Sequence, residues 1–361
     1  MFKLLGGLAH YLKQQDIVTD CVIFRLHNLF TTALLMACSL IITATQFVGR
    51  PIQCIVEGRN PHVVNTFCWI SSTFSMPDAF KRQVGTEVAG PGIANDFDDV
   101  HAHKYYTYYQ WVCFVLFFQG IACYLPKYLW DIFENNLMKT LVMGLNIGAT
   151  PEKVKNARKE ILIDYLLEHL KRHKLYAIRY WCCECLCLVN ILIQLFLMNK
   201  FFDGEFLSYG WRVMTYSSEI QEERVDPMVF IFPRVTKCNF YKYGPSGSIQ
   251  KHDSLCVLPL NIVNEKTYIF IWFWFMILAT LLTLLIIYRI CMLVSPRVRT
   301  RIFHAKNYGL PLEISETITR KVDIGDWWIL FMLGTNMDTL IFREMISELA
   351  KRIEVKGSNR R

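Results

Sequence analysis

The sequence lacks the short motifs by which many enzymes bind phosphate, hold a catalytic metal or activate a serine. It contains no P-loop, no HExxH and no GxSxG string, and no pair of acids accompanies a plausible nucleophile. The glycines around Gly90 and Gly244 match no phosphate-binding loop. We therefore predict that the chain is not an enzyme and that it holds neither a metal nor a cofactor.

Charged residues are scarce as well. They make up 19% of the 361 residues, against about 25% in a typical soluble domain, whereas 53% are apolar and 14% aromatic. No small-residue cleavage site follows the opening MFKLLGGLAHYLK, so we expect this segment to be retained. The composition indicates an integral membrane protein rather than two soluble domains.

Four stretches are long and apolar enough to cross a hydrocarbon core, which takes about 20 residues of helix. They are residues 29–49, 105–125, 180–198 and 267–288. Only the third contains a charge, Glu184. We interpret this carboxylate as lying at the headgroup level beside Arg179, and the functional alternative as the less favoured one.

Lysine and arginine in the connecting segments predict the orientation, because basic loops resist translocation. Residues 126–178 hold nine basic against six acidic residues, and residues 289–361 hold thirteen against eight. Residues 50–104 hold five against six, and residues 199–266 hold eight against eight. We therefore expect both termini and the two basic segments in the cytoplasm, and the other two segments outside.

This orientation divides the chain into nine segments. They are a cytoplasmic N-terminal segment 1–28, the first span 29–49, the first extracellular loop 50–104, the second span 105–125, a cytoplasmic helical loop 126–179, the third span 180–198, the second extracellular loop 199–266, the fourth span 267–288 and a cytoplasmic helical region 289–361. Arginines after the fourth span could touch anionic lipid, although they mainly indicate topology. They are Arg289, Arg297, Arg299 and Arg301.

Two helices are expected in the cytoplasmic segments. One has Thr150 as its N-cap and Pro151 at its first position, and the other covers about residues 338–353. The apolar positions of the first are Val154, Ile161, Tyr165 and Leu166.

The thirteen cysteines separate by compartment. Cys54 and Cys68 lie in the first extracellular loop, and Cys238 and Cys256 in the second, where disulfides can form. Four cysteines allow three connectivities, which sequence alone cannot separate. A small β element is expected around Cys238 to Cys256. Four further cysteines begin the third span, and we interpret them as packing residues rather than metal ligands. They are Cys182, Cys183, Cys185 and Cys187.

The first span carries polar residues on one side of its helix. At about 100° per residue they fall within a narrow sector, which as a set favours a water-filled pathway. Each serine or threonine alone is explained at least as well by a hydrogen bond to its own helix or by packing between helices. The predicted pore-lining residues are Arg25, Asn28, Thr32, Ser39, Thr43 and Gln46.

A YYQWV string at residues 108–112 lies at the start of the predicted second span. It resembles the signature of the innexin family, as do PRVTKC before Cys238, KYGPSG at 242–247, CVLPLNIVNEKTY from Cys256 and IGDWW at 324–328. The resemblance covers essentially the whole chain. The signature residues are Tyr108, Tyr109, Gln110, Trp111 and Val112. Their rings also suit a structural anchor at a membrane interface, which we favour over a ligand site.

The resemblance implies an all-α membrane protein. Its four-transmembrane-helix bundle would have a short N-terminal helix, disulfide-braced extracellular loops with a small β element, and a helical cytoplasmic domain. The implied disulfides are Cys54–Cys256 and Cys68–Cys238. The N-terminal segment, with Met1 and Phe2 near the constriction, would narrow the cytoplasmic mouth of the pore.

The resemblance also implies the assembly: a hemichannel of eight subunits that docks with a second hemichannel on the adjacent cell. The predicted function is a gap-junction channel subunit of the plasma membrane that passes ions and small molecules between cells. Other innexins could join as hetero-oligomeric partners, and membrane lipids surround the assembly. No nucleic acid is expected, because the basic residues are explained by topology.

Two alternatives stay open. A pannexin-like hemichannel would remain unpaired, whereas the complete lack of Asn-x-Ser/Thr acceptors favours bare loops that can dock. A tetraspan adhesion protein of claudin type would have a cysteine pair in its first loop only, whereas this chain has a pair in each loop.

Overall fold

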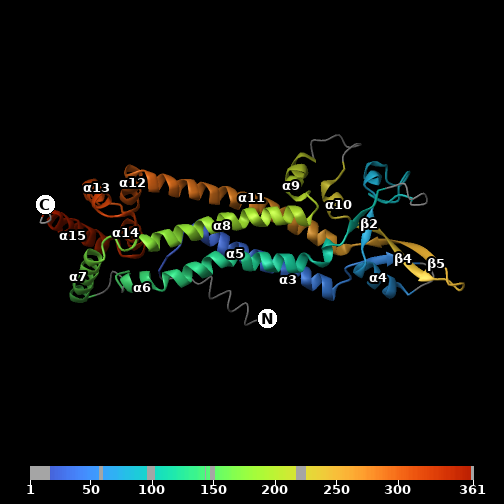
Figure 1. Cartoon of the computed structure of the whole chain (residues 1–361), viewed down its shortest axis with the longest axis horizontal. Coiled ribbons are helices and arrows are strands. Elements are labelled where there is room, and N and C mark those ends of the chain that lie inside the picture. Colours follow the sequence, from blue (N-terminus) through green and yellow to red (C-terminus); the bar gives the residue numbers. More distant parts are fainter. Residues whose placement is uncertain are drawn as a thin grey trace. The chain divides into compact units, whose positions relative to one another are not determined.

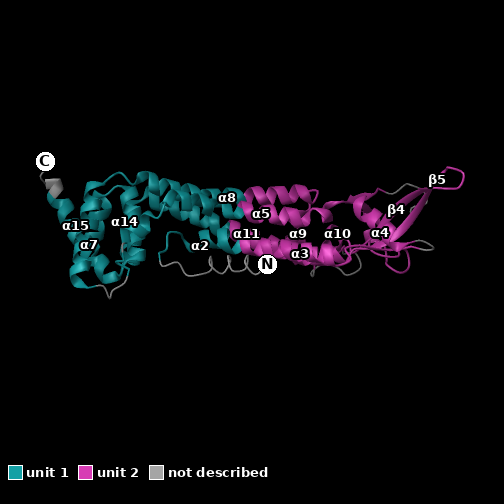
Figure 2. Cartoon of the chain, turned by 90° about the horizontal axis from the view of Figure 1, so that it is seen from below, with its two compact units in different colours: residues 1–31, 123–190, 280–361 teal, residues 32–122, 191–279 magenta. Residues whose placement is uncertain are grey.

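The computed structural model describes residues 17–56, 60–95, 102–142, 144–146, 151–216 and 225–358. The chain divides into two compact units, which are coloured separately in Figure 2. Unit 1 comprises residues 1–31, 123–190 and 280–361, and unit 2 comprises residues 32–122 and 191–279. Each unit is described by itself below.

Four helices are long and apolar enough to cross a membrane (Figure 1). The first, Val22–Val48, consists of α2 (Val22–Arg25), a π-helical turn η1 (Leu26–Phe30) and α3 (Thr31–Val48). The others are α5 (Val112–Glu134), α8 (Lys174–Phe201) and α11 (Pro259–Val294). Each of the four predicted spans falls on one of these helices, and each helix extends beyond the predicted span at one end or both.

The predicted start of the second span is wrong. Residues 104–106 form a strand, β3 (Lys104–Tyr106), because they pair with β2 (Thr73–Ser75). A 3₁₀ turn, η3 (Tyr108–Gln110), follows the strand, and the α-helix begins only at Val112. Of the YYQWV string, only its last residue, Val112, therefore belongs to the membrane helix.

Unit 2 contains a five-stranded antiparallel sheet. Its strand order is β1-β5-β4-β2-β3, with β1 (Gln53–Ile55), β4 (Val235–Tyr243) and β5 (Ile249–Val257) completing the set. The β4–β5 hairpin confirms the β element predicted around Cys238 to Cys256. The other three strands come from the first loop, where the sequence indicated no strand.

Short helices flank this sheet within unit 2. They are α4 (Pro61–Ile70), η2 (Pro77–Lys81), α9 (Phe206–Thr215) and α10 (Pro227–Ile231). Asn60 caps α4 by accepting a hydrogen bond from the His62 amide, and Pro61 occupies the first helical position. The buried cluster beside the sheet consists of Ile52, Cys54, Val64, Cys68, Tyr106, Tyr109, Cys238, Cys256 and Leu258.

Unit 1 contains helices and no strand among its described residues. Besides parts of the four long helices it contains α6 (Leu137–Val142), α7 (Glu152–Glu168), α12 (Pro296–Lys306), α13 (Leu312–Lys321), α14 (Ile324–Asn336) and α15 (Thr339–Ser358). Both predicted cytoplasmic helices are present as α7 and α15, although Pro151 is the N-cap of α7 and Thr150 lies outside the described residues. The α7 helix buries Leu162, Ile163 and Leu166. Two of the positions predicted to be apolar contacts, Val154 and Ile161, are exposed.

Candidate functional site

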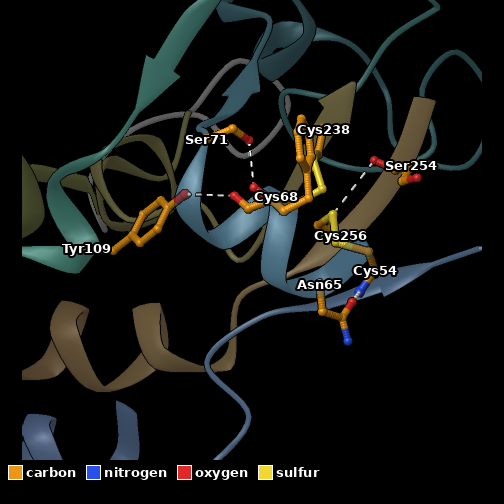
Figure 3. Close-up of a disulfide and its surroundings, with 9 residues drawn as sticks. Cys54, Asn65, Cys68, Ser71, Tyr109, Cys238, Ser254 and Cys256 are labelled. Atoms are coloured by element: carbon orange, nitrogen blue, oxygen red, sulfur yellow. Dashed lines mark hydrogen bonds between the residues drawn. A yellow bond between two sulfur atoms is a disulfide. The ribbon is translucent and has the colours of Figure 1, made fainter. Parts of the chain in front are cut away.

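The four loop cysteines form two disulfides beside the sheet of unit 2 (Figure 3). Cys54 on β1 lies opposite Cys256 on β5 in the strand register and is bonded to it. Cys68 on α4 is bonded to Cys238 on β4. This is the pairing that the resemblance implied. Each disulfide joins the first loop to the second, across 202 and 170 residues respectively.

The disulfides also account for the one group of possible metal ligands among the described residues. The sulfur atoms of Cys54, Cys68 and Cys256 lie within 4.8 Å of one another and are buried. A sulfur atom in a disulfide is no longer a thiolate, which is the form that binds a metal. This cluster is therefore a covalent brace and not a metal site.

The aromatic string before α5 fastens that helix to the disulfide region. The Tyr109 hydroxyl donates a hydrogen bond of 3.4 Å to the Cys68 carbonyl, and its ring centroid lies 4.8 Å from that of Trp69. The Gln110 side chain donates to the Trp69 carbonyl. The Tyr108 hydroxyl donates to the carbonyl of Ile231 at 3.1 Å. The string thus packs between α4, α5 and α10, in keeping with a structural anchor.

The tip of the β4–β5 hairpin is exposed on the surface of unit 2. The chain reverses between Tyr243 and Ile249, where Gly247 has a φ of 79° that favours glycine. Tyr243 is 76% exposed and Ile249 68% exposed, so two large apolar side chains lie on the surface of this tip. Apolar side chains of this size at an exposed hairpin end are suited to contact with another protein.

The polar stripe predicted on the first span does not form an exposed face. Asn28 and Ser39 are buried. The Asn28 amide donates to the Phe24 carbonyl at 2.7 Å, and the Ser39 hydroxyl donates to the Cys113 carbonyl of α5 at 2.8 Å. In this structure these two side chains are packing residues, because neighbouring helices of the same chain cover them.

The remaining members of the stripe are half-buried. Thr32 donates to the Gly120 carbonyl, and Thr43 donates to the Ser39 carbonyl one turn earlier. Arg25 is paired with Asp20 at 2.6 Å, and Gln46 lines a cavity of about 600 Å³ within unit 2. The exposed residues of this span are mostly apolar instead. They are Val22, Phe30, Ala37, Leu40, Ile41, Ala44, Phe47 and Val48.

The residues before the first span, 17–21, are held by several elements of unit 1. We call this segment the N-terminal anchor. The Asn336 side chain at the end of α14 binds the backbone of Val18 twice: it accepts from the Val18 amide at 2.5 Å and donates to the Val18 carbonyl at 2.8 Å. Two opposed hydrogen bonds fix this segment as a neighbouring strand would. Met1 and Phe2, the predicted constriction residues, lie outside the described residues.

Ion pairs and a hydrogen bond hold the next residues of the N-terminal anchor. Asp20 is buried and pairs with Lys127 of α5 at 3.1 Å as well as with Arg25. The Cys21 amide donates to the Tyr180 hydroxyl of α8 at 2.9 Å. The N-terminal anchor therefore contacts α5, α8 and α14.

A buried ion pair lies directly beside the N-terminal anchor. Glu184 on α8 is fully buried and Arg289 on α11 is 6% exposed. Two hydrogen bonds of 2.7 Å join the guanidinium to both carboxylate oxygens. The Cys21 sulfur lies 3.5 Å from the same carboxylate, and the guanidinium lies 4.7 Å from the ring centroid of Trp328 on α14.

This geometry corrects two predictions. The partner of Glu184 is Arg289 and not Arg179, which is exposed and lies over the ring of Phe133. Arg289 does not belong to the exposed basic cluster after the fourth span. A carboxylate and a guanidinium taken out of water require each other, because either one alone would be a buried uncompensated charge.

The IGDWW motif allows α14 to pack closely against the start of α8. A Cβ on Gly325 would collide with the backbone of Lys174 at the start of α8, so only glycine allows the two helices to approach this closely. Asp326 pairs with His173 at 2.7 Å and accepts a hydrogen bond from the Lys171 amide at 2.5 Å. Trp327 and Trp328 are buried.

A comparison of the chain with protein families gives a match over most of its length. The family model described as innexin matches residues 20–353. The chain belongs to the innexin family. The match begins in the N-terminal anchor and includes the four long helices, the disulfide-braced sheet and most of α15.

Individual relatives agree over nearly their whole length. Innexin inx1 of Schistocerca americana is 66% identical over 359 residues, which is 99% of each chain. Innexin inx1 of Drosophila melanogaster is 64% identical over 360 residues, covering 100% of this chain and 99% of the relative. Innexin shaking-B of the same fly is 46% identical over 354 residues, covering 98% and 95%.

Some contacts in the structure of this innexin were not predicted from its sequence. Asn336 and Val18 are 318 residues apart, and Glu184 and Arg289 are 105 residues apart. Each partner by itself has an ordinary explanation, since a polar residue near a helix end is common. One signal could have been used: Glu184 and Arg289 are both charges at the border of an apolar helix, where an unpaired charge is costly.

Proposed function

We propose that this innexin is a gap-junction channel subunit, which forms oligomeric hemichannels that dock between adjacent cells and pass ions and small molecules passively. The observation that carries the proposal is the match to the innexin family over residues 20–353, together with four helices of membrane-spanning length. No cofactor and no reaction are needed, because solutes diffuse down their own gradients through a water-filled pore.

The state of the cysteines supports the proposed orientation. All four cysteines of residues 50–104 and 199–266 are in disulfides, whereas the nine others are free thiols. Disulfides persist on the oxidising, extracellular side of a membrane and are rare in the cytosol. We therefore place these two loops outside the cell and residues 1–28, 126–179 and 289–361 inside it.

The hairpin tip supports docking. Its exposed Tyr243 and Ile249 are held on a sheet whose two loops are joined covalently, so the tip is presented on a rigid base. A rigid base limits the entropy lost when two such surfaces meet. We propose that hairpin tips of opposed hemichannels meet across the intercellular gap, and that eight subunits form each hemichannel.

The N-terminal anchor supports a constriction at the cytoplasmic end of the pore. The N-terminal anchor is held in place by the contacts of Val18, Asp20 and Cys21, and the first residues of the chain extend from it. We propose that Met1 and Phe2 narrow the pore mouth from there. Among the polar residues of the first span, we retain only the half-buried Arg25, Thr32, Thr43 and Gln46 as candidates for contact with the pathway.

The test is junctional conductance between paired cells that express this chain, with the membrane current of single cells recorded in parallel. Cys68→Ser and Cys238→Ser should each abolish coupling, because each breaks the disulfide that ties α4 to β4. Cys182→Ser is the matched control, since Cys182 is an exposed free thiol, and coupling should persist.

Other outcomes would change the function. Abundant surface protein with single-cell current but no coupling would favour the unpaired, pannexin-like hemichannel. Surface protein that produces neither current would favour the adhesion protein. Coupling that survives both disulfide variants would remove the braced sheet from the docking mechanism.

A further inference from the structure

Unit 1 contains a cavity of about 690 Å³ that the channel function does not use. It lies among α12, α13 and the start of α14, next to the last turn of α11. Four arginines line it: Arg297, Arg299 and Arg301 from α12, and Arg320 from α13. Arg297 and Arg301 are one helical turn apart and share a face of α12.

The acidic residues that line this cavity do not neutralise its positive charge. Glu316 and Asp323 also line it, so the arginines outnumber the acids by two. Within the part of the chain that the structure describes, no ion pair joins either acid to any of the four arginines. The cavity therefore retains guanidinium groups for an external anion.

Among these four arginines, Arg299 provides the most direct evidence for anion binding. Its Nε atom is buried and has no hydrogen-bond partner among the described residues. Burial lowers the pKa of Arg299, an effect that nearby Asp323 opposes. A bound anion would supply the missing acceptor and would favour the charged guanidinium.

An apolar surface leads to the cavity along α11. Leu284, Ile287, Cys291 and Val294 are exposed and recur at the spacing of one helical face. They occupy the last three turns of the fourth membrane helix, and Leu293, one residue before the helix ends, lines the cavity. Along the chain, the apolar surface of α11 is followed by the arginine cavity. The acyl chains and the headgroup of a phospholipid have the same order.

We propose that this cavity binds the phosphate-bearing headgroup of an anionic phospholipid, whose acyl chains lie along the exposed face of α11. The planar guanidinium group forms paired hydrogen bonds with phosphate oxygens, and basic pockets at the cytoplasmic ends of membrane helices suit such headgroups. A free phosphate compound would use the same arginines, but it would leave the apolar face of α11 without a role.

The test is native mass spectrometry of the full-length assembly in detergent, with one ligand added at a time. The probes are dioctanoyl phosphatidylinositol 4,5-bisphosphate, dioctanoyl phosphatidylcholine and free inositol 1,4,5-trisphosphate. The wild-type chain should bind the anionic lipid more tightly than either of the other two. The triple variant Arg297→Gln, Arg301→Gln, Arg320→Gln should lose this preference, by about fivefold in affinity for each arginine removed.

A charge-matched control separates the cavity from the general positive charge. The triple variant Lys139→Gln, Lys153→Gln, Lys351→Gln removes the same charge from exposed positions of unit 1 and should keep the preference. Equal loss in both variants, or equal binding of phosphatidylcholine, would overturn the proposal. Equal binding of free inositol trisphosphate would replace the lipid by a soluble phosphate ligand. Since binding is measured without current, none of these results depends on channel activity.

Discussion

Unit 2 joins its two loops with two disulfides, whereas every described cysteine of unit 1 is a free thiol and a buried ion pair links α8 to α11 there. Both solutions connect segments that are far apart in the chain. The covalent one persists where the surroundings are oxidising, and the ionic one is strongest where burial excludes water. Ion pairs on buried carboxylates occur in both units, whereas the disulfides are confined to the unit that carries the proposed extracellular loops.

The largest effect is expected from breaking the ionic link of unit 1. Arg289→Met leaves Glu184 buried without a partner and should lower the free energy of unfolding by about 3–5 kcal/mol. Thermal unfolding of the detergent-solubilised protein measures this loss. Arg179→Met is the control, because Arg179 is exposed and makes no contact with Glu184 in this structure. Equal stability of the two variants would contradict the buried pair.

Breaking the covalent link of unit 2 should have the next largest effect. Cys68→Ser should lower the free energy of unfolding by about 2–5 kcal/mol, because the unfolded loops gain freedom. A reductant should destabilise the wild-type chain and affect this variant less. Cys291→Ser, which removes an exposed free thiol, should behave as the wild type does. A reductant effect of the same size in Cys68→Ser would show that this disulfide does not stabilise the sheet.

A smaller loss is expected where α14 meets α8. Gly325→Ala forces a methyl group against the backbone of Lys174 and should lower the free energy of unfolding by about 1–3 kcal/mol. Gly90→Ala in unit 2 is the control, because its added Cβ meets only the Ile93 side chain at 3.6 Å. If both variants unfold at the same temperature, the close helix approach is not required.

The smallest loss of stability is expected from Asn336→Leu. It removes both hydrogen bonds to Val18 and should cost about 1 kcal/mol, because the freed backbone groups can still reach water. The substitution should have a larger local effect, because the backbone amides of residues 17–25 should exchange hydrogen faster. Thr335→Val changes the neighbouring residue, whose hydroxyl bonds only to its own helix, and should leave that exchange unchanged.

Much of the architecture could be predicted from the sequence because hydrophobic length is a local property. The four membrane helices, the β element at the second loop and two of the helices of unit 1 followed from composition and spacing. The start of the second span did not, since its tyrosines suit a strand, a turn and a membrane interface equally well. Pairing with Thr73–Ser75, a long-range contact, decides among these.

The site residues were harder to predict, since a helical stripe has two possible meanings. The spacing of Asn28 and Ser39 indicates a shared face, but it does not say whether that face meets water or another helix. The structure answers with contacts to other helices: Asn28 donates to the Cys187 sulfur of α8, and Ser39 donates to the Cys113 carbonyl of α5. Glu184 posed the same difficulty, because no local pattern identifies a partner 105 residues away.

The bond between Asn336 and Val18 also bears on the order in which the protein is made. Val18 leaves the ribosome early, but its partner follows 318 residues later, which at ordinary synthesis rates takes roughly 15 to 60 s. The N-terminal anchor cannot reach its final position before almost the whole chain has been synthesised. A truncated subunit that lacks α14 would therefore insert its membrane helices while its N-terminal anchor has no Asn336 to bind.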